Sequence, residues 1–528
     1  MTQGSSHYRW SKGAVLGLVI CLLVAGAARM PSLDAALTAD EVWMLAGSAG
    51  HGRDIGLFWK RDLVQSALTS PTDLKTARPV QEIWTNSVEF HPPLHSVLLR
   101  LWRELIGGSD RKARAFSMAW SFVTVGMIFA ALRLQFNSLV ATCAALILAL
   151  SPLQNHLSTE VRSYPMVIAF MSIAAWLVVR IETLGVTRWQ VWSLGLLCLP
   201  MMLSHYFAAG PCLAITIWGV WRLRGRMRIN FLMAVAVAAG LFLTLWVPFA
   251  WRDVSELDGN QFLLSRDPSR RFQAIADLPE RMLITGDGVR ALRTGSIALL
   301  ALVLTAWKDR RMQIWCLLLF VPMATILMLD FWRGTEIIRW ARYCAFMSLG
   351  MAVAPVAAGF AVNRRFGLIV TASMIIAILP YMHLERDLGS LRHDHMIREF
   401  SPIVLKEPQK LPMVSVNGSL STSWHPSLVH WAEVPGFAPR PTLVLSDNPD
   451  AAVLKDLRAV SPDGRFWLTS YGLDPITEKE ASPPQWLRQR LPGTTVLEGP
   501  WLLPKGQGKA SERLPMSLWL MQFDRSPA

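Results

Sequence analysis

The sequence is poor in charged residues and has no patterned cysteines, and each shortage excludes a class of protein. Charged residues make up only 17% of the 528 positions, whereas 52% are hydrophobic and the mean hydropathy is +0.32. A soluble enzyme of this length would carry more charge, so the composition indicates a polytopic membrane protein. No cysteine forms a CxxC pair and all lie in apolar segments, which predicts buried small side chains and no disulfide framework or zinc site. The six are Cys21, Cys143, Cys198, Cys212, Cys316 and Cys344.

The net charge of +14 would suit a nucleic-acid-binding protein, but the distribution of the arginines indicates a different cause. Many of them cluster between apolar runs, where basic residues mark the cytoplasmic side of a membrane protein. The densest linkers are "WRLRGRMR" (221–228), "KDRR" (308–311) and "NRR" (363–365). We therefore expect all three in the cytoplasm, and we expect no nucleic-acid partner.

About eleven apolar stretches approach the ~20 residues that a helix needs to cross a bilayer. They are residues 12–29, 115–133, 138–153, 164–181, 189–205, 207–222, 229–251, 294–307, 312–330, 343–361 and 366–383. At the first stretch, Arg9 and Lys12 precede the apolar run 13–28, which is consistent with a signal peptide or an uncleaved anchor, of which we favour the anchor.

The stretch "EFHPPLHSVLLRLW" (89–102) is apolar but is predicted not to span the membrane. If residues 30–114 are wholly external, counting spans places all three basic linkers inside, whereas a span at 92–106 would place them outside. The stretch is also short, and its leucines share one helical face while Arg100 and Arg103 point elsewhere. We expect an interfacial helix in a large first external loop, residues 30–114.

The predicted fold is a polytopic all-α membrane domain over residues 1–383, followed by an extracytoplasmic α/β domain over residues 384–528. In the second domain, strand-like and helix-like runs alternate, which is typical of a small α/β unit. The strand-like runs are 442–447, 465–472 and 516–523, and the helix-like runs are 450–460 and 483–491. We find no catalytic motif in this domain.

Ionisable residues gather at the predicted outer ends of the spans, where charge near hydrocarbon is costly and usually has a purpose. Asp40 and Glu41 begin an amphipathic helix, either as partners of the helix dipole or as a general base. His91 precedes two prolines, and an ordinary structural histidine is the competing interpretation. Later outer boundaries add Glu160, Arg162, Tyr164, His205, Tyr206, Glu336, Arg339, Arg342 and Tyr343. Snorkelling explains any single arginine, but the whole set on one face suits an anionic phosphate with a carboxylate free to take a proton.

The ordered motifs "ADE", "HPPL", "SP…EVRSY", "SHYFA" and "ARY" resemble the bacterial GT-C glycosyltransferases. Within them, the chain looks like the dolichyl-phosphate-mannose-protein mannosyltransferase-like branch, which includes the lipid A aminoarabinose transferases. The resemblance covers roughly residues 10–380. It implies transfer of a hexosyl or pentosyl group from a polyprenyl-phosphate donor, such as undecaprenyl phosphate, to a lipid, polysaccharide or protein acceptor. It also implies a bacterial inner-membrane location with the active site facing the periplasm.

The resemblance further implies roles for single residues. Asp40 is the implied general base of an inverting transfer, with Glu41 beside it. The implied donor-phosphate residues are Arg162, His205, Arg342 and Tyr343, and the other implied site residues are His91, Glu160, Tyr164, Tyr206 and Arg339. Some relatives carry an acidic residue where Arg162 stands, so its partner, donor phosphate or acceptor, stays open. A divalent metal at Asp40 and His91 also stays open, and no other cofactor is implied.

A transporter or flippase for a lipid-linked sugar is the alternative. Such a protein would place ionisable residues near the bilayer midplane and show repeated halves. Here the predicted spans are almost free of charge and the ionisable residues crowd one face, which favours the enzyme. A structural or sensory membrane protein would leave the set of motifs unexplained.

Overall fold

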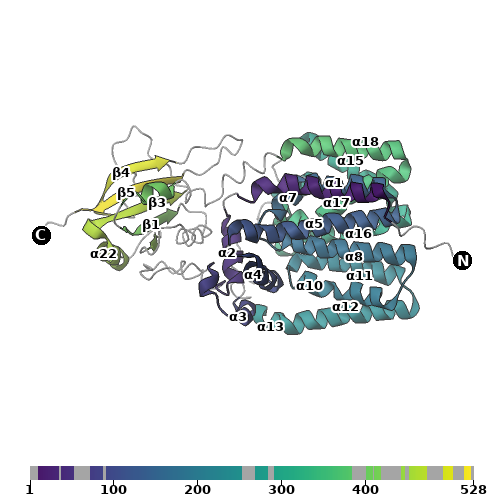
Figure 1. The fold of residues 1–528 in the computed structure, drawn as a ribbon, viewed down its shortest axis with the longest axis horizontal. Helices are drawn as coiled ribbons and strands as arrows, with labels where there is room; N and C mark the ends of the chain where they lie inside the picture. The colour runs from purple at the N-terminus through teal and green to yellow at the C-terminus, as the bar shows by residue number, and fades with distance from the viewer. Residues whose placement is uncertain are drawn as a thin grey trace. The chain divides into compact units, whose positions relative to one another are not determined.

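The chain divides into two compact units, whose helices and strands are labelled in Figure 1. Unit 1 comprises Met1–Asp34 and Phe90–Arg386, and unit 2 comprises Ala35–Glu89 and Asp387–Ala528. The computed structural model describes residues 10–34, 37–52, 72–86, 91–251, 268–282, 290–382, 400–407, 410–417, 442–445, 451–471, 491–502 and 516–524.

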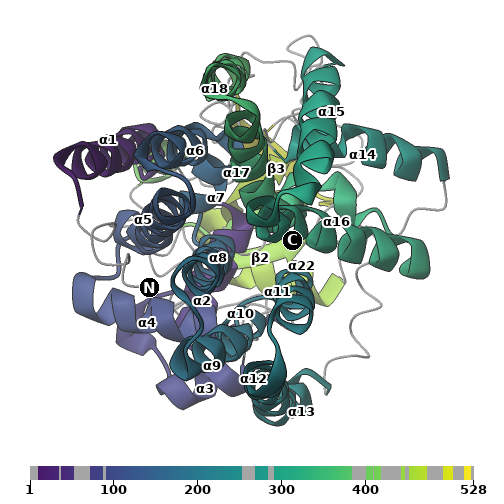
Figure 2. The ribbon, with the colours of Figure 1, turned by 90° about the vertical axis from the view of Figure 1, so that its right-hand side faces the viewer.

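Unit 1 is a bundle of helices that run side by side and are seen end-on in Figure 2. Among the described residues, seven helices are long and apolar enough to cross a membrane. They are built on α1 (Lys12–Arg29), α5 (Asp110–Gln135), α8 (Tyr164–Leu184), α12 (Gly225–Leu245), α16 (Gln313–Arg333), α17 (Ala345–Val362) and α18 (Arg364–Ile378). The helices α6 (Ser138–Leu150) and α7 (Pro152–Ser158) form a further apolar pair, bent by 62°. The polytopic helical fold class is thus confirmed.

The count of eleven spans is not confirmed, because three predicted spans are shorter helices. The predicted span 189–205 is divided between α9 (Arg188–Leu196) and α10 (Cys198–Met202), and 207–222 contains the short turn η6 (Tyr206–Ala208) and α11 (Ala209–Arg222). The predicted span 294–307 is divided between α15 (Arg290–Thr305), a 16-residue helix, and the short turn η9 (Ala306–Lys308). Pro200 explains the first break, because it has no N–H to bond the carbonyl of Leu196.

The bend between α6 and α7 is held by a buried arginine from α1. Pro152 has no N–H for the carbonyl of Leu148, so the bend leaves carbonyls at the end of α6 without helical partners. Arg29, 1% exposed, donates hydrogen bonds to the carbonyl oxygens of Ala149 at 2.9 Å and Leu148 at 3.5 Å, and to Ser158 Oγ at 2.7 Å. One guanidinium group therefore fixes the segment that leads to Glu160 and Arg162.

Replacing Arg29 by methionine is expected to destabilise the protein, because it leaves buried carbonyl groups unpaired. We expect a loss of about 2–4 kcal/mol, the cost of one or two unsatisfied buried polar groups. Thermal unfolding of the purified protein in detergent would measure it, with Arg111→Met as the control, because Arg111 is 61% exposed. An unchanged melting temperature for Arg29→Met would contradict this account of the bend.

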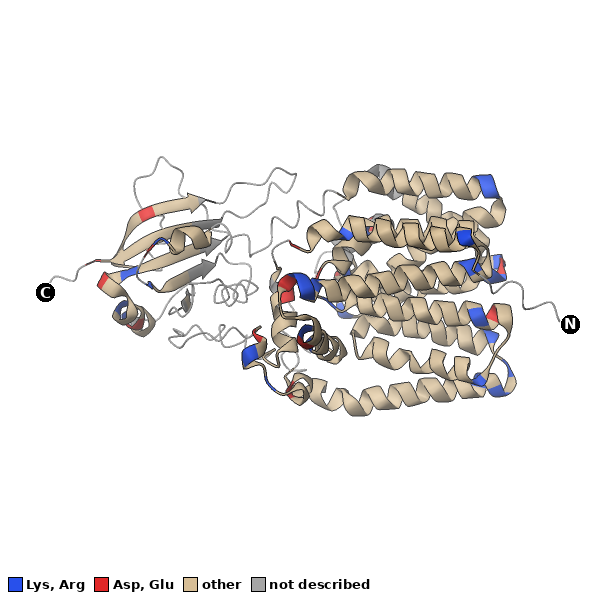
Figure 3. Ribbon diagram, viewed as in Figure 1, with Lys and Arg blue, Asp and Glu red and all other residues tan. Residues whose placement is uncertain are grey.

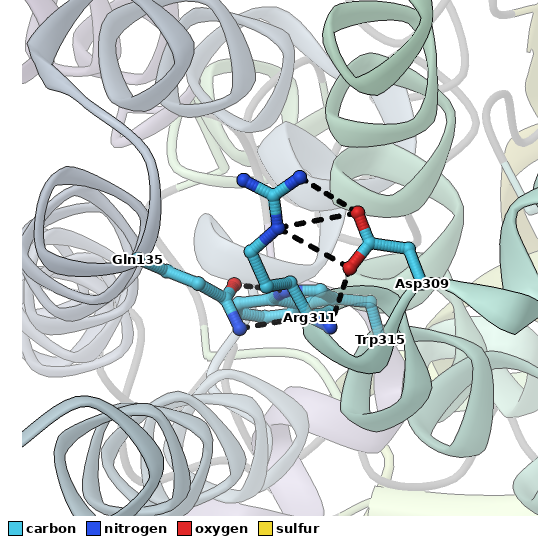
Figure 4. A network of polar contacts seen from close by, with 4 residues as sticks. All are labelled: Gln135, Asp309, Arg311 and Trp315. Carbon is cyan, nitrogen blue, oxygen red and sulfur yellow. Dashed lines mark hydrogen bonds and ion pairs between the residues drawn. The ribbon is translucent and has the colours of Figure 1, made fainter.

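The basic linkers lie at one end of the bundle, the right-hand end in Figure 3. Trp221, at the end of α11, stacks on Trp307 with ring centroids 5.8 Å apart, which brings the first two linkers together. Arg311 pairs with Asp309 at 2.7 Å, and its carbonyl accepts a hydrogen bond from Gln135 at the end of α5 (Figure 4). Gln135 in turn accepts a hydrogen bond from Trp315 Nε1 at 2.8 Å. Which side of the membrane this end faces stays a prediction.

The segment after the double proline forms α4 (Leu94–Ile106), which is not among the candidate spans. Its Arg100 and Arg103 are buried, whereas Leu101 is 44% exposed and Leu105 is 83% exposed. Leu99 is buried with the arginines, whereas Leu101 and Leu105 leave an apolar face exposed, which suits a helix at a membrane interface. The predicted helical face is therefore present in the structure.

Unit 2 contains a five-stranded mixed sheet with strand order β2-β1-β3-β5-β4. The strands are β1 (Met413–Asn417), β2 (Thr442–Leu445), β3 (Arg465–Tyr471), β4 (Thr494–Leu502) and β5 (Met516–Phe523). The strand β1 runs parallel to β2 and β3, whereas β5 is antiparallel to β3 and β4. The helix α22 (Ala451–Val460) packs Leu457 against Phe466 and Trp519 in the core of this sheet. The three predicted strands and the first predicted helix are present, and the predicted helix at 483–491 lies outside the described residues.

The same unit contains the helices of the first predicted external loop that precede residue 90. They are α2 (Ala39–Ser48), the short turn η4 (Leu74–Thr76) and α3 (Val80–Thr85). The carbonyl of Ala49 accepts a hydrogen bond from the N–H of Arg78, which joins the end of α2 to the segment before α3.

Candidate active site

An aromatic and histidine cluster lies at the end of the bundle opposite to the basic linkers. At its centre is His205, 2% exposed, in the turn between α10 and η6. Its ring centroid lies 5.6 Å from that of His91, 5.0 Å from Tyr164 and 5.2 Å from Phe346. Tyr164 is the first residue of α8, and the other end of α8 lies among the basic linkers, where Glu182 pairs with Arg222. The cluster and the linkers are thus separated by the length of this helix.

The double proline and one backbone hydrogen bond bring His91 to this cluster. The N–H of Leu94 donates to the carbonyl of Leu203 at 3.0 Å, which joins the start of α4 to the end of α10. Pro92 and Pro93 are buried immediately before α4. Because proline has a fixed φ and suits the entry to a helix, the two residues hold His91 in a defined position beside His205.

The hydrogen bonds of His205 define which ring nitrogen is a donor. Its Nδ1 accepts the backbone N–H of Phe207 at 3.1 Å, so in the neutral ring the proton lies on Nε2. Nε2 is buried and has no hydrogen-bond partner in the part of the chain that the structure describes. A buried donor without a partner is costly, and it is rare in proteins unless a ligand or water completes it. The Nε2–H of His205 is therefore suited to a ligand oxygen.

Two arginines add positive charge around the cluster. The Cζ atom of Arg162, a residue 8% exposed, lies 5.5 Å from the ring centroid of Tyr164. The Cζ atom of Arg342 lies 5.3 Å from the ring centroid of Tyr343, and Tyr343 packs on Phe207 at 5.0 Å. Guanidinium groups at the edge of a buried aromatic site are typical of carboxylate or phosphate recognition.

Burial, more than the neighbouring arginines, lowers the pKa of His95 and of His205. Burial, helped by the positive charges of Arg162 and His91, lowers the pKa of His95 to about 3. The pKa of His205 lies well below its ordinary value, chiefly because of burial and then because of the charges of His91, Arg162 and Arg342. The rings of His95 and His205 are therefore neutral near pH 7, and Arg162 and Arg342 supply permanent positive charge beside them.

A buried carboxylate shapes the loop that carries Arg342. Asp330 accepts hydrogen bonds from Thr335 Oγ1 at 2.6 Å and from the backbone N–H groups of Ile337 and Ile338 at 2.8 and 2.9 Å. These bonds fix η11 (Ile337–Arg339), which Trp340 joins to η12 (Ala341–Cys344). Sequence analysis did not select Asp330, although a lone aspartate at the end of an apolar span is a usable signal.

The structure places other predicted site residues in different surroundings. Glu160 Oε1 lies 3.5 Å from His156 Nε2, and Tyr206 Oη accepts a hydrogen bond from Trp246 Nε1 at 2.7 Å. The side chain of Arg339 lies outside the described part of the structure. Sequence analysis also did not select His95, whose ring packs on Phe116 with centroids 5.7 Å apart. It lies in the first turn of α4, four residues after His91 in the sequence.

Asp40 and Glu41 lie in the first turn of α2, in unit 2. Glu41 is fully buried and forms a capping box with Thr38. Its carboxylate accepts the N–H of Thr38 at 2.7 Å, and the hydroxyl of Thr38 accepts the N–H of Glu41 at 3.3 Å. Asp40 is half-buried and has no part in the capping box. Of the two carboxylates, Glu41 therefore has a structural task and Asp40 is the better candidate for chemistry.

No group of three or more His, Cys, Asp or Glu side chains that could hold a metal ion occurs within the described ranges. A metal at Asp40 and His91 stays a prediction.

Comparison with known proteins gives this bundle a family resemblance. Residues 90–251 match the family model described as dolichyl-phosphate-mannose-protein mannosyltransferase. The solved structures of ArnT from Cupriavidus metallidurans in the apo state and bound to undecaprenyl phosphate are similar, with TM-scores of 0.52 and 0.51. In both comparisons the sequences are 12% identical, and the match covers 96% of this chain and 97% of ArnT. A search of curated proteins finds no significant match.

The chain has the GT-C glycosyltransferase fold. This confirms the resemblance drawn from the sequence motifs, and it identifies a multi-pass membrane protein. The family model covers the part of the GT-C bundle that contains His91, Arg162, Tyr164 and His205.

Proposed function

We propose that this GT-C protein is an integral-membrane glycosyltransferase that moves a sugar from a polyprenyl-phosphate carrier to an acceptor hydroxyl. The observation that carries the proposal is the buried Nε2–H of His205, which lacks a partner in the described residues and lies in a cluster edged by Arg162. A neutral donor beside guanidinium groups suits the phosphate of a lipid carrier. The matched family model and the ArnT structure bound to undecaprenyl phosphate support the same class of ligand.

The proposed reaction is an inverting displacement. The acceptor oxygen forms a bond to the anomeric carbon, the bond from that carbon to the phosphate oxygen breaks, and polyprenyl phosphate leaves. Asp40 takes the acceptor proton, as the resemblance implies. The negative charge that grows on the leaving oxygen is stabilised by Arg162, Arg342 and the Nε2–H of His205.

Each finer part of the proposal rests on the same resemblance. The transferred group is a hexose or pentose, and the acceptor is a lipid, a polysaccharide or a protein. The protein lies in a bacterial inner membrane, with the histidine cluster on the periplasmic face and the basic linkers in the cytoplasm. Tyr343 lines the donor-phosphate site, and Tyr164 and His91 lie beside it.

The test is a transfer assay with the purified full chain, polyprenyl-phosphate sugars and candidate acceptors. We expect release of polyprenyl phosphate in equal amount to the glycosylated acceptor. The same donors, placed in sealed vesicles that contain the protein, distinguish transfer from transport. Movement of intact lipid-linked sugar across the vesicle membrane, without release of polyprenyl phosphate, would contradict the proposal.

A further inference from the structure

A second site is suggested by a cavity at the basic end of the bundle. Its volume is about 480 Å³, which lies in the range of small-molecule pockets. Its walls come from α5 and α8, including Met127, Leu134 and Ile173, and Trp10 also lines it. These walls are apolar, so the interior suits a hydrocarbon chain.

Two arginines are the charged residues that line this cavity, and no acidic residue lines it within the described part of unit 1. The Cζ atom of Arg133 lies 4.4 Å from the ring centroid of Trp10, and that of Arg180 lies 5.5 Å from the ring centroid of Trp176. Both guanidinium groups are thus held against aromatic rings beside the cavity. Arginines near the C-terminal ends of α5 and α8 also stabilise the helix dipoles and mark the cytoplasmic side of a membrane protein. Neither role explains why a cavity lies between them.

The cavity is separate from the histidine cluster. Tyr164 of the cluster and Arg180 of the cavity lie on the same helix, sixteen residues apart. At ~1.5 Å per residue, this separation is about 24 Å along α8. A ligand in the cavity would therefore lie at the opposite membrane interface from the proposed donor phosphate.

We propose that the cavity between α5 and α8 binds an anionic phospholipid, with an acyl chain against its apolar wall and its phosphate at Arg133 and Arg180. The positive charge of the lining favours an anionic ligand, because its charged residues are two arginines and it includes no carboxylate in the described part of unit 1. A phosphate group is complementary to this charge. Indole side chains beside the arginines are typical of the level of lipid headgroups. This site goes beyond the proposed transfer reaction, since it requires neither the donor nor the acceptor.

The test is lipid binding by the delipidated full chain in detergent, followed by native mass spectrometry and thermal unfolding. The probes are phosphatidylglycerol, which is anionic, and phosphatidylcholine, which is zwitterionic. We expect wild-type protein to bind phosphatidylglycerol preferentially and to melt at a higher temperature with it. The double variant Arg133→Gln, Arg180→Gln should bind phosphatidylglycerol about 30-fold more weakly, which corresponds to about 1 kcal/mol for each arginine.

The matched control is Arg188→Gln, because Arg188 is exposed at the start of α9, at the same end of the bundle. It removes positive charge without altering the cavity and should bind phosphatidylglycerol as the wild type does. Equal affinity of wild type for the two lipids, wild-type affinity in the double variant, or an equal loss in Arg188→Gln would each overturn the proposal. If the double variant does not fold, Arg133→Lys, Arg180→Lys keeps both charges and should keep the preference for phosphatidylglycerol. Loss of the preference in that folded lysine variant would also overturn the proposal.

Discussion

Asp40→Asn is expected to reduce sugar transfer by ~10²–10⁴-fold, the usual contribution of a positioned general base. The amide keeps the size of the side chain but cannot accept the proton of the acceptor hydroxyl. Donor binding should be unchanged, because the variant removes no group proposed to contact the phosphate. The measurement is single-turnover release of polyprenyl phosphate, combined with a binding assay for polyprenyl phosphate.

Asp34→Asn is the matched control for this prediction. Asp34 is 62% exposed and pairs with Arg111 at 3.0 Å, so the same chemical change there should leave turnover near that of the wild type. Glu41→Gln tests the neighbouring carboxylate, and it should lower stability through the capping box by ~0.5–2 kcal/mol. Full turnover in a folded Asp40→Asn protein would exclude Asp40 as the base.

Arg162→Met is expected to lower the rate of transfer by ~10²–10³-fold, as the loss of one preorganised group that stabilises a growing negative charge does. Arg162 is buried beside Tyr164, and its charge acts on both His95 and His205. The methionine retains much of the side-chain volume, so the main change is loss of the guanidinium charge. Separate titrations of donor and acceptor would show which of them Arg162 binds.

A donor-phosphate role predicts weaker binding of polyprenyl phosphate to Arg162→Met and partial recovery with Arg162→Lys. Arg111→Met, at an exposed position, removes the same charge and should have little effect. Unchanged donor binding together with a raised KM for the acceptor would instead assign Arg162 to the acceptor.

Charge distribution and helical periodicity were sufficient to predict the bundle and the character of α4. The helix α4 has the predicted face, with Leu101 and Leu105 exposed. The location of residues 30–114 on one side of the membrane stays a prediction. The count of eleven spans was not confirmed, because hydropathy locates apolar runs but does not show where a helix in such a run breaks or bends. Apolar runs of similar composition form long helices in some places and short or bent ones at Pro152 and Pro200.

The cluster around His205 was only partly predictable, because its members come from four distant segments. The motifs selected His91, Tyr164 and His205, but no sequence spacing shows that Phe346 packs on the same ring. The roles of Arg29 and Asp330 were also missed, since each depends on backbone groups that a bend or loop leaves unpaired. In unit 2, the strands β1 and β4 were not predicted. Strand formation depends on the neighbouring strand as well as on residue type, and here β1 pairs with β3 and β4 pairs with β5.

The central claim is that the histidine cluster holds the phosphate of a lipid carrier. The most direct test is an experimental structure of the full chain with polyprenyl phosphate bound. We predict a phosphate oxygen within ~2.7–3.2 Å of His205 Nε2, the range of an N–H···O hydrogen bond, with the guanidinium of Arg162 beside the same phosphate. Density for the phosphate at Arg133 and Arg180, with His205 Nε2 still without a ligand, would contradict the claim.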